Sequence, residues 1–320
     1  MLFKTIVERG KTIESIHNAK CLVKDKNYKN LLSSNNDKDY VYPRSAIKIF
    51  QALPFIVSGA HKKYSLNHKQ LAIACSSHCG ENFHISVLSE WIKKINLSTS
   101  NLKCGIHNPI NIQSSNKLLL TGKKPSELYN NCSGKHLAML SGCLAKNFNI
   151  SGYLNLSHPY QKLIRSSLEY FTEHAIEKNN IGIDGCSAPQ YSFPMENLSR
   201  AMVNLVKKTK TKNKYSNAVS LLLKSISENP KLIGGTNRFD TEIIKITKGR
   251  IFCKGGAEGV LLFADTSKNF GGIIKIIDGN ERAIPSVAIE IFIKLKMLLI
   301  NEKKYLKKWS KKTLYNHANK

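Results

Sequence analysis

The segment Arg44-Ser45-Ala46-Ile47-Lys48 opens a predicted helix. Residues three positions apart on a helix share one face, with their Cβ atoms about 5–6 Å apart. The serine hydroxyl and the lysine amine of this segment are therefore expected to lie together. A Ser-x-x-Lys pair makes a serine nucleophile without histidine, provided that the lysine can be held neutral. The pattern alone is common on solvated helix faces, so its interpretation depends on other motifs in the chain.

The composition indicates a protein with a substantial core and no membrane span. The chain has 320 residues, of which 42% are hydrophobic. The most apolar run, residues 287–300, is interrupted by Glu290, Lys294 and Lys296, and a span needs about 18 uninterrupted apolar residues. The first residues contain no apolar stretch typical of a signal peptide. We therefore expect a cytoplasmic protein that does not contact a membrane.

The formal net charge of +27 raises the question of a nucleic-acid partner. The basic residues are spread along the chain, with denser runs at 207–214 and 303–312. The second run falls at every fourth position, as on the solvated face of a helix. Zinc-finger spacing and RNA-binding aromatic motifs are absent from the sequence. We therefore expect a basic surface without nucleic-acid binding.

The order of predicted elements indicates an α+β architecture. Short antiparallel strands are expected in the first 40 residues, followed by a long helical region. Two further strands are expected over 251–264 and 273–277, and a long helix over 283–300. Strands at both ends with helices between them predict one antiparallel sheet with a central helical region.

A second lysine lies in the predicted late strand, within Lys254-Gly255-Gly256. Enzymes with a Ser-x-x-Lys pair often place a Lys-Thr-Gly strand beside the serine, and small residues there let a substrate lie against the strand. A glycine-containing hairpin explains the same residues equally well. Ser77 lies in a polar loop where a second hydroxyl can relay a proton, although a turn followed by a helix cap is the simpler interpretation.

Two of the eight cysteines lie where a thiolate is plausible. Cys132 and Lys135 are three apart at a predicted helix start, and both a helix N-terminus and a nearby lysine lower the pKa of a thiol. Cys186 lies on a tight turn after a short strand. Two cysteines do not complete a zinc site, which normally has three or four ligands. Buried reduced cysteines are the competing interpretation, and disulfides are not expected without export.

Six ordered motifs together resemble the asparaginase II family, the Rhizobium-type enzymes distinct from the threonine-dependent asparaginases. The resemblance runs from about residue 5 to residue 300. The motifs are Arg44-Ser45-x-x-Lys48, Ser77-His78-x-Gly80-Glu81, Asn131-Cys132-Ser133-Gly134-Lys135-His136, Ile183-Asp184-Gly185-Cys186, Gly235-Thr236-x-Arg238-Phe239-Asp240 and Lys254-Gly255-Gly256-Ala257-Glu258-Gly259.

The resemblance implies a serine β-lactamase-like or penicillin-binding-protein-like fold that hydrolyses L-asparagine to L-aspartate and ammonia. It implies a single domain over 1–320, with a core over about 5–300 and a basic C-terminal helix over 301–320, and a homodimer. The implied catalytic residues are Ser45, Lys48, Ser77 and Lys254. The implied zinc ligands are Cys132, Lys135 and Cys186, with the zinc positioning groups rather than reacting. The implied substrate contacts are Arg44 and His136, with Asp184 orienting a ligand or water.

Two other functions remain open on the sequence. Within acyl transfer, the Ser-x-x-Lys pair also fits a glutaminase or a penicillin-interacting hydrolase. In a different class, a zinc-containing protein of this fold that binds an amino acid without turnover fits the same residues. Ammonia release from asparagine, compared with release from glutamine, distinguishes these alternatives.

Overall fold

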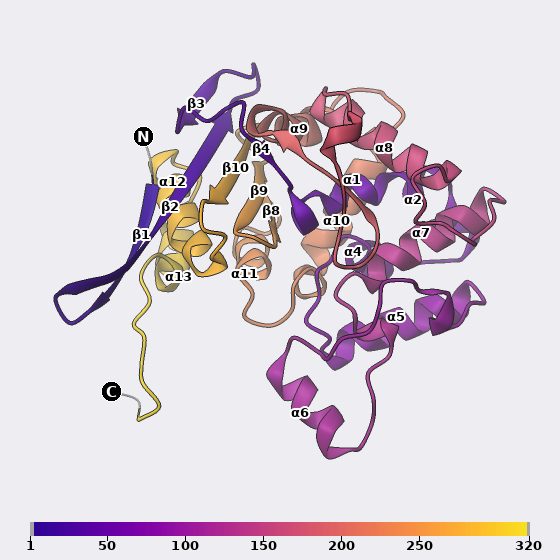
Figure 1. Ribbon diagram of the computed structural model, residues 1–320. Coiled ribbons are helices and arrows are strands. Elements are labelled where there is room, and N and C mark those ends of the chain that lie inside the picture. The colour runs from indigo at the N-terminus through magenta and orange to yellow at the C-terminus, as the bar shows by residue number, and fades with distance from the viewer. Residues whose placement is uncertain (1–2, 319–320) are drawn as a thin grey trace.

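Strands from the two ends of the chain form one antiparallel sheet in the computed structural model, which describes residues 3–318 (Figure 1). The strand order is β1-β2-β10-β9-β8, and β3 also pairs with β2. The strands are β1 (Phe3–Arg9), β2 (Thr12–Lys24), β3 (Asn30–Ser33), β8 (Ile251–Gly256), β9 (Val260–Asp265) and β10 (Phe270–Ile276). The predicted antiparallel sheet of N- and C-terminal segments is confirmed.

The two ends of the chain meet where β2 pairs with β10. Leu22 lies opposite Ile273, and Cys21 lies opposite Ile274. Successive side chains of a strand point to opposite faces of the sheet. Leu22 and Ile273 therefore join the core shared with the central helices, while Cys21 and Ile274 join a second core on the other face. Because both faces are covered, every residue of β9 is buried.

The helical region lies between β3 and β8. Its longer helices are α4 (His68–Ile73), α5 (Asn82–Lys94), α6 (Ile112–Leu120), α7 (Ser133–Ala145), α8 (Pro159–Thr172), α9 (Met195–Lys207), α10 (Ser216–Glu228) and α11 (Phe239–Ile246). The shorter pieces are η1 (Arg44–Ile47), α1 (Lys48–Gln51), α2 (Leu53–Val57), α3 (Ala60–Lys63), η2 (Thr99–Asn101), η3 (Glu127–Tyr129), η4 (Lys178–Asn180) and η5 (Pro230–Leu232). Two small antiparallel pairs complete it, β4 (Tyr40–Val41) with β7 (Phe193–Pro194) and β5 (Ile181–Ile183) with β6 (Pro189–Tyr191).

Helices cover both faces of the sheet. On one face α9 packs against β10, and Gly271 permits this because a Cβ there would collide with the backbone at Val203. On the other face lie η6 (Glu281–Ala283), α12 (Ile284–Lys294) and α13 (Ile300–Ser310). Figure 1 shows the helical region standing beside the sheet, with α1 and α4 near the strands and α6 farthest away. The junction between the helices and β8 is where the predicted site residues meet.

Two predicted helices differ from those observed. The Ser45 helix begins as a 3₁₀ turn and is divided into η1, α1 and α2, because Pro54 occupies the first turn of α2 and cannot continue a preceding helix. The helix predicted over 283–300 ends at Lys294, and Lys296 adopts a left-handed conformation with φ +52° before α13 begins.

The helix predicted over 301–320 is α13, which ends at Ser310. Residues 311–318 form no helix, and 319–320 lie outside the described residues. The lysines of α13 lie mostly on its exposed side, whereas Leu306 is buried on the other. Within residues 3–318, no helix combines the length and apolar character that crossing a bilayer requires.

Candidate active site and metal site

Lys48 is the buried centre of the candidate active site. Its side chain is fully buried, and its amine nitrogen lies within hydrogen-bonding distance of Ser76 O at 2.5 Å, Ser77 Oγ at 3.0 Å and Cys132 Sγ at 3.2 Å. Burial lowers the pKa of Lys48 because it penalises the charged form. The Cys132 sulfur opposes this shift, and the charge of Lys135 reinforces it. Lys48 is thus held in surroundings that favour a neutral amine.

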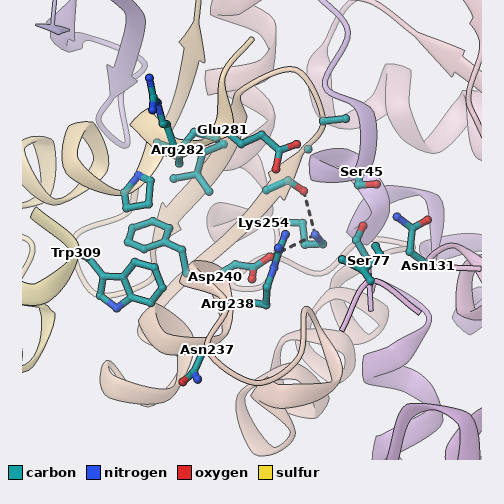
Figure 2. Close-up of a pocket in the computed structure, with 18 residues that line it drawn as sticks. Ser45, Ser77, Asn131, Asn237, Arg238, Asp240, Lys254, Glu281, Arg282 and Trp309 are labelled. Carbon is teal, nitrogen blue, oxygen red and sulfur yellow. Dashed lines mark hydrogen bonds and ion pairs between the residues drawn. The ribbon is translucent and has the colours of Figure 1, made fainter. Parts of the chain in front are cut away.

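Ser77 connects Lys48 to a pocket. The serine lies in the loop after α4, where its backbone N–H donates to Ile233 O at 2.9 Å. Its hydroxyl faces a pocket of about 450 Å³ that Ser45 and Asn131 also line. Figure 2 shows Ser45, Ser77 and Asn131 grouped on one side of this pocket. The pocket therefore presents two serine hydroxyls, one of which contacts the buried lysine.

The predicted contact between Ser45 and Lys48 is not formed. The Ser45 hydroxyl has no hydrogen-bond partner among residues 3–318, although it lines the pocket. The buried Lys48 amine finds its hydrogen-bond partners elsewhere, at Ser76 O, Ser77 Oγ and Cys132 Sγ, and a buried polar group needs such partners. Ser45 and Lys48 therefore both lie at the site, but the hydrogen bond of Lys48 is formed with Ser77 and not with Ser45.

Lys254 lies across the same pocket on β8. Its side chain is buried, and its amine contacts Asp240 Oδ2 at 3.3 Å and Gly255 O at 2.9 Å. Gly256 explains the Lys-Gly-Gly motif, because a Cβ at that position would collide with Pro43 O beside η1. The absence of that Cβ lets β8 lie directly against the turn that carries Ser45.

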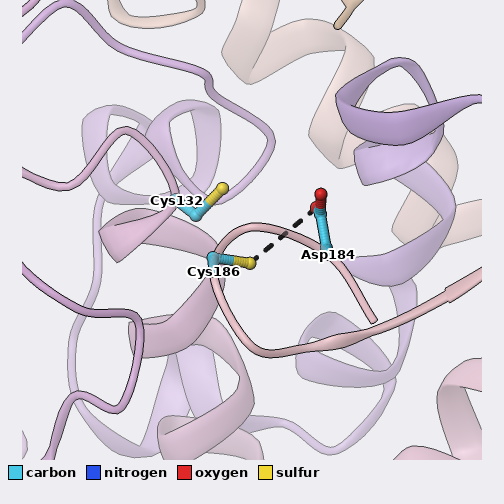
Figure 3. A group of neighbouring side chains, drawn as sticks. All are labelled: Cys132, Asp184 and Cys186. Carbon is cyan, nitrogen blue, oxygen red and sulfur yellow. Dashed lines mark hydrogen bonds between the residues drawn. The ribbon is translucent and has the colours of Figure 1, made fainter. Parts of the chain in front are cut away.

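A candidate metal site lies on the other side of Lys48. The ligand atoms of Cys132, Asp184 and Cys186 all lie within 4.8 Å of one another (Figure 3). Cys132 precedes α7, whereas Asp184 and Cys186 come from the loop between β5 and β6. The Lys135 amine lies 3.1 Å from Cys186 Sγ and 3.9 Å from Asp184 Oδ2. Two thiols, a carboxylate and an amine fit zinc, which takes four sulfur, nitrogen or oxygen ligands.

The charges in this cluster are tightly linked. A hydrogen bond from the Cys186 thiol lowers the pKa of Cys132 well below its usual value, and the same bond raises the pKa of Cys186. Burial alone would lower the pKa of Lys135, but the neighbouring Cys186, Cys132 and Asp184 outweigh it and raise that pKa. Without metal, the cluster therefore holds a protonated Lys135 near a thiolate centred on Cys132.

The predicted substrate contacts lie outside the pocket. Arg44 donates from Nε to Asp184 Oδ1 at 2.9 Å, which ties the turn before Ser45 to the metal-site loop. Arg44 has φ +50°, a strained value for a residue with a side chain. His136 is fully buried on α7, and its Nδ1 lies 2.6 Å from the Tyr153 hydroxyl. Neither Arg44, Asp184 nor His136 is among the residues that line the pocket around Ser45.

One motif that lies at the site contains none of the predicted site residues. Asp240, the ion-pair partner of Lys254, belongs to the motif Gly235-Thr236-x-Arg238-Phe239-Asp240. The presence of this motif among the six that carry the family resemblance was the sequence feature that could have identified Asp240. Arg238 and Asn237 of the same loop also line the pocket.

Comparisons with known proteins agree with the motifs. The L-asparaginase II family profile matches residues 5–320. No curated protein sequence matches the chain. Among solved structures, one similar chain is a "putative beta-lactamase" from Bacteroides dorei DSM 17855. That chain is 10% identical with a TM-score of 0.44, and the superposition covers 87% of this chain and 92% of the other.

Proposed function

This chain belongs to the L-asparaginase II family, and on that premise we propose that it hydrolyses L-asparagine to L-aspartate and ammonia. Family membership makes the protein a hydrolase of this group. The observation that carries the specific proposal is the Lys48–Ser77 hydrogen bond of 3.0 Å at a pocket that Ser45 also lines. A buried amine beside one hydroxyl, with a second hydroxyl free to attack, is suited to acyl transfer.

In the proposed reaction Ser45 is the nucleophile. Its oxygen bonds to the side-chain amide carbon, and its proton passes through the Ser77 hydroxyl to the neutral Lys48 amine. The same path returns a proton to the amide nitrogen as the C–N bond breaks and ammonia leaves. Water then attacks the aspartyl ester on Ser45, gives its proton to the relay and releases L-aspartate. The lowered pKa of Lys48 supports its role as base near neutral pH.

We assign stabilisation of the oxyanion to Asn131. The N–H of Ala46, the nearest candidate after Ser45, already donates to Pro43 O at 3.0 Å. The Asn131 side-chain amide lines the pocket beside the serines and has no hydrogen-bond partner within residues 3–318. An oxyanion donor of this kind commonly contributes about 3–4 kcal/mol to catalysis.

We propose that Cys132, Lys135 and Cys186 hold zinc, with Asp184 either as a further ligand or as their orienting partner. When bound, zinc supplies a fixed positive charge that neutralises the thiolates. The Arg44–Asp184 ion pair ties the turn before Ser45 to the loop between β5 and β6, and Lys135 ties the start of α7 to the same loop. Zinc binding at this cluster is therefore proposed to position the site.

The family match supports three further proposals. A single domain over 1–320 is supported because the profile spans residues 5–320. The pairing of a Ser-x-x-Lys turn with a Lys-Gly-Gly strand supports a serine β-lactamase-like fold. Family membership supports a homodimer.

Ammonia release by wild-type protein and by Ser45→Ala tests the function. Wild type should release ammonia from L-asparagine faster than from L-glutamine, and Ser45→Ala should lose this activity while keeping its circular dichroism spectrum. Acid quenching during turnover followed by peptide mapping should place an aspartyl ester on Ser45. An ester on Ser77 instead would reverse the roles of the serines, and binding of asparagine without turnover would favour the non-catalytic alternative.

A further inference from the structure

Two of the charged side chains that line the pocket form no hydrogen bond or ion pair with any residue of 3–318. Lys254 is paired with Asp240, and Arg282 donates to His17 Nε2 at 2.9 Å and to Ser15 Oγ at 2.9 Å. Arg238 and Glu281 line the same pocket, and within residues 3–318 neither side chain forms a hydrogen bond or an ion pair.

Arg238 and Glu281 approach the pocket from different elements. Arg238 lies in the loop before α11, and Glu281 begins η6 after β10. Figure 2 shows Glu281 above and Arg238 below the space in front of Ser45. One cation and one anion, both unpaired, therefore face the same space as the candidate nucleophile.

The loop that carries Arg238 is fixed to the segment that carries Ser77. The Thr236 N–H donates to Glu81 Oε1 at 2.7 Å, and its hydroxyl donates to Glu81 Oε2 at 2.8 Å. The Cys79 thiol donates to Gly234 O at 2.9 Å. An arginine on a loop held in this way keeps its position relative to the serines, as a specificity-determining group must.

Gly235 makes this attachment possible. Its φ of +124° suits only glycine, and a Cβ there would lie 2.5 Å from Glu81 Oε1 and 3.1 Å from Cys79 Sγ. A Cβ would therefore push the loop away from Glu81. The glycine of the motif thus sets the distance between Arg238 and the serine side of the pocket.

We propose that Arg238 binds the α-carboxylate of the substrate and that Glu281 binds its α-ammonium group. This inference rests on the proposed function and deepens it. A guanidinium matches a carboxylate with two parallel hydrogen bonds, and a carboxylate pairs with an ammonium group. The pocket then selects a free amino acid with a side-chain amide, because an asparagine within a peptide lacks both charges.

Three amide substrates distinguish the contact proposed for Arg238 from the contact proposed for Glu281. L-Asparagine carries both charged groups, β-alaninamide lacks the α-carboxylate, and succinamate lacks the α-ammonium group. Arg238→Gln should lower kcat/KM for asparagine and succinamate by roughly 10- to 100-fold, mostly through KM, and leave β-alaninamide unchanged. Glu281→Gln should lower kcat/KM for asparagine and β-alaninamide and leave succinamate unchanged. Arg238→Lys should partly restore the activity lost in Arg238→Gln.

The matched control is Arg200→Gln, because Arg200 pairs with Glu173 and does not line the pocket. It should leave kcat/KM for all three amides unchanged. An equal loss for all three amides in Arg238→Gln, or no loss for any, overturns the inference.

Calorimetric titration with three product analogues separates this inference from the proposed function. L-Aspartate carries both charged groups, whereas β-alanine and succinate each lack one. If the wild type releases no ammonia, the proposed function fails, and binding alone decides the inference. Weaker binding of aspartate and succinate, but not of β-alanine, to Arg238→Gln supports it. Equal binding of aspartate to the wild type and to Arg238→Gln overturns it, as does a failure of the wild type to bind aspartate.

Discussion

Lys48 and Lys135 are both buried lysines, both contact a cysteine sulfur, and their pKa values are displaced in opposite directions. For Lys48 burial is the largest effect and lowers its pKa, and the nearby charges of Lys135 and Lys254 lower it further against the opposing effect of Cys132. Lys135 lies beside the Cys132–Cys186 pair, which shares a thiolate charge, and beside the Asp184 carboxylate, so negative neighbours outweigh burial and raise its pKa. The comparison teaches that burial alone does not make a lysine basic or acidic. The charge of its nearest neighbours decides.

Cys132 is where the two environments meet. It accepts a hydrogen bond from Lys48 at 3.2 Å and belongs to the metal-ligand cluster with Cys186. One lysine therefore faces the serines and the other faces the thiols, with a single sulfur between them. We therefore expect substitution of Lys48 to impair turnover and substitution of Lys135 to impair zinc binding.

The largest expected effect is on turnover in Lys48→Met. Methionine fills a similar volume without an amine, so the base is lost while the packing is kept. General-base catalysis commonly contributes about 10²–10⁴-fold, and kcat for asparagine hydrolysis should fall by about that factor. Steady-state ammonia release measures it.

Lys62→Met is the control for this loss, because Lys62 is an exposed lysine on α3. It should keep the wild-type kcat. Turnover in folded Lys48→Met within tenfold of the wild type would remove Lys48 as the base.

A smaller effect is expected on zinc binding in Lys135→Met. If Lys135 ligates zinc, it must lose its proton first, so zinc binding should release more protons from the wild type than from the variant. The affinity should also fall by roughly 10- to 100-fold, the range for losing a group that supports a metal site. Calorimetry in two buffers with different ionisation enthalpies measures both quantities.

The control for zinc binding is Lys146→Met, since Lys146 is exposed at the end of the same helix. It should bind zinc as the wild type does. Equal proton release from the wild type and Lys135→Met would place Lys135 outside the ligand set.

The smallest expected effect concerns stability in acid. Burial lowers the pKa of His84 from 6.5 to about 4, as burial lowers that of Lys48. Between pH 6.5 and 4 the unfolded chain binds a proton at His84 that the folded chain does not. Stability should therefore fall as the pH falls through this window, by up to about 1.4 kcal/mol per pH unit. Urea unfolding at several pH values measures the slope.

His84→Asn should show a shallower slope over this window, even if it is less stable at neutral pH. His317 is exposed, so His317→Asn is the matched control and should keep the wild-type slope. A slope in His84→Asn equal to that of the wild type would show that other groups cause the acid sensitivity.

The sequence predicted the parts of the site that depend on local pattern. The strand and helix order, the Ser45 turn, the loop of Ser77 and the Lys254 strand each have a local signal. The close grouping of Cys132 and Cys186 came from the family resemblance, and their sulfur atoms do lie together. Motifs that share one pocket were thus identifiable before the fold was known.

Features that depend on competition between partners were not predictable. The choice of Ser77 over Ser45 by Lys48 depends on acceptors from Ser76 and Cys132, which are distant in sequence from the lysine. The hydrogen bond between His136 and the Tyr153 hydroxyl, and the full burial of His136, likewise have no local signal in the motif that contains the histidine. Sequence patterns identify which groups a chain carries, whereas packing determines which group each one contacts.

The pairing of β2 with β10 also orders events during synthesis of the chain. The N-terminal strands and the Ser45 turn leave the ribosome early, whereas β8, β9 and β10 leave late. Until β10 is synthesised, the edge of β2 that pairs with it is open. Leu22 and Val23, which are fully buried in the finished sheet, also lack the contacts that bury them. Such an edge can pair with other chains. The nascent chain therefore depends on its last quarter to cover this edge and to complete the sheet.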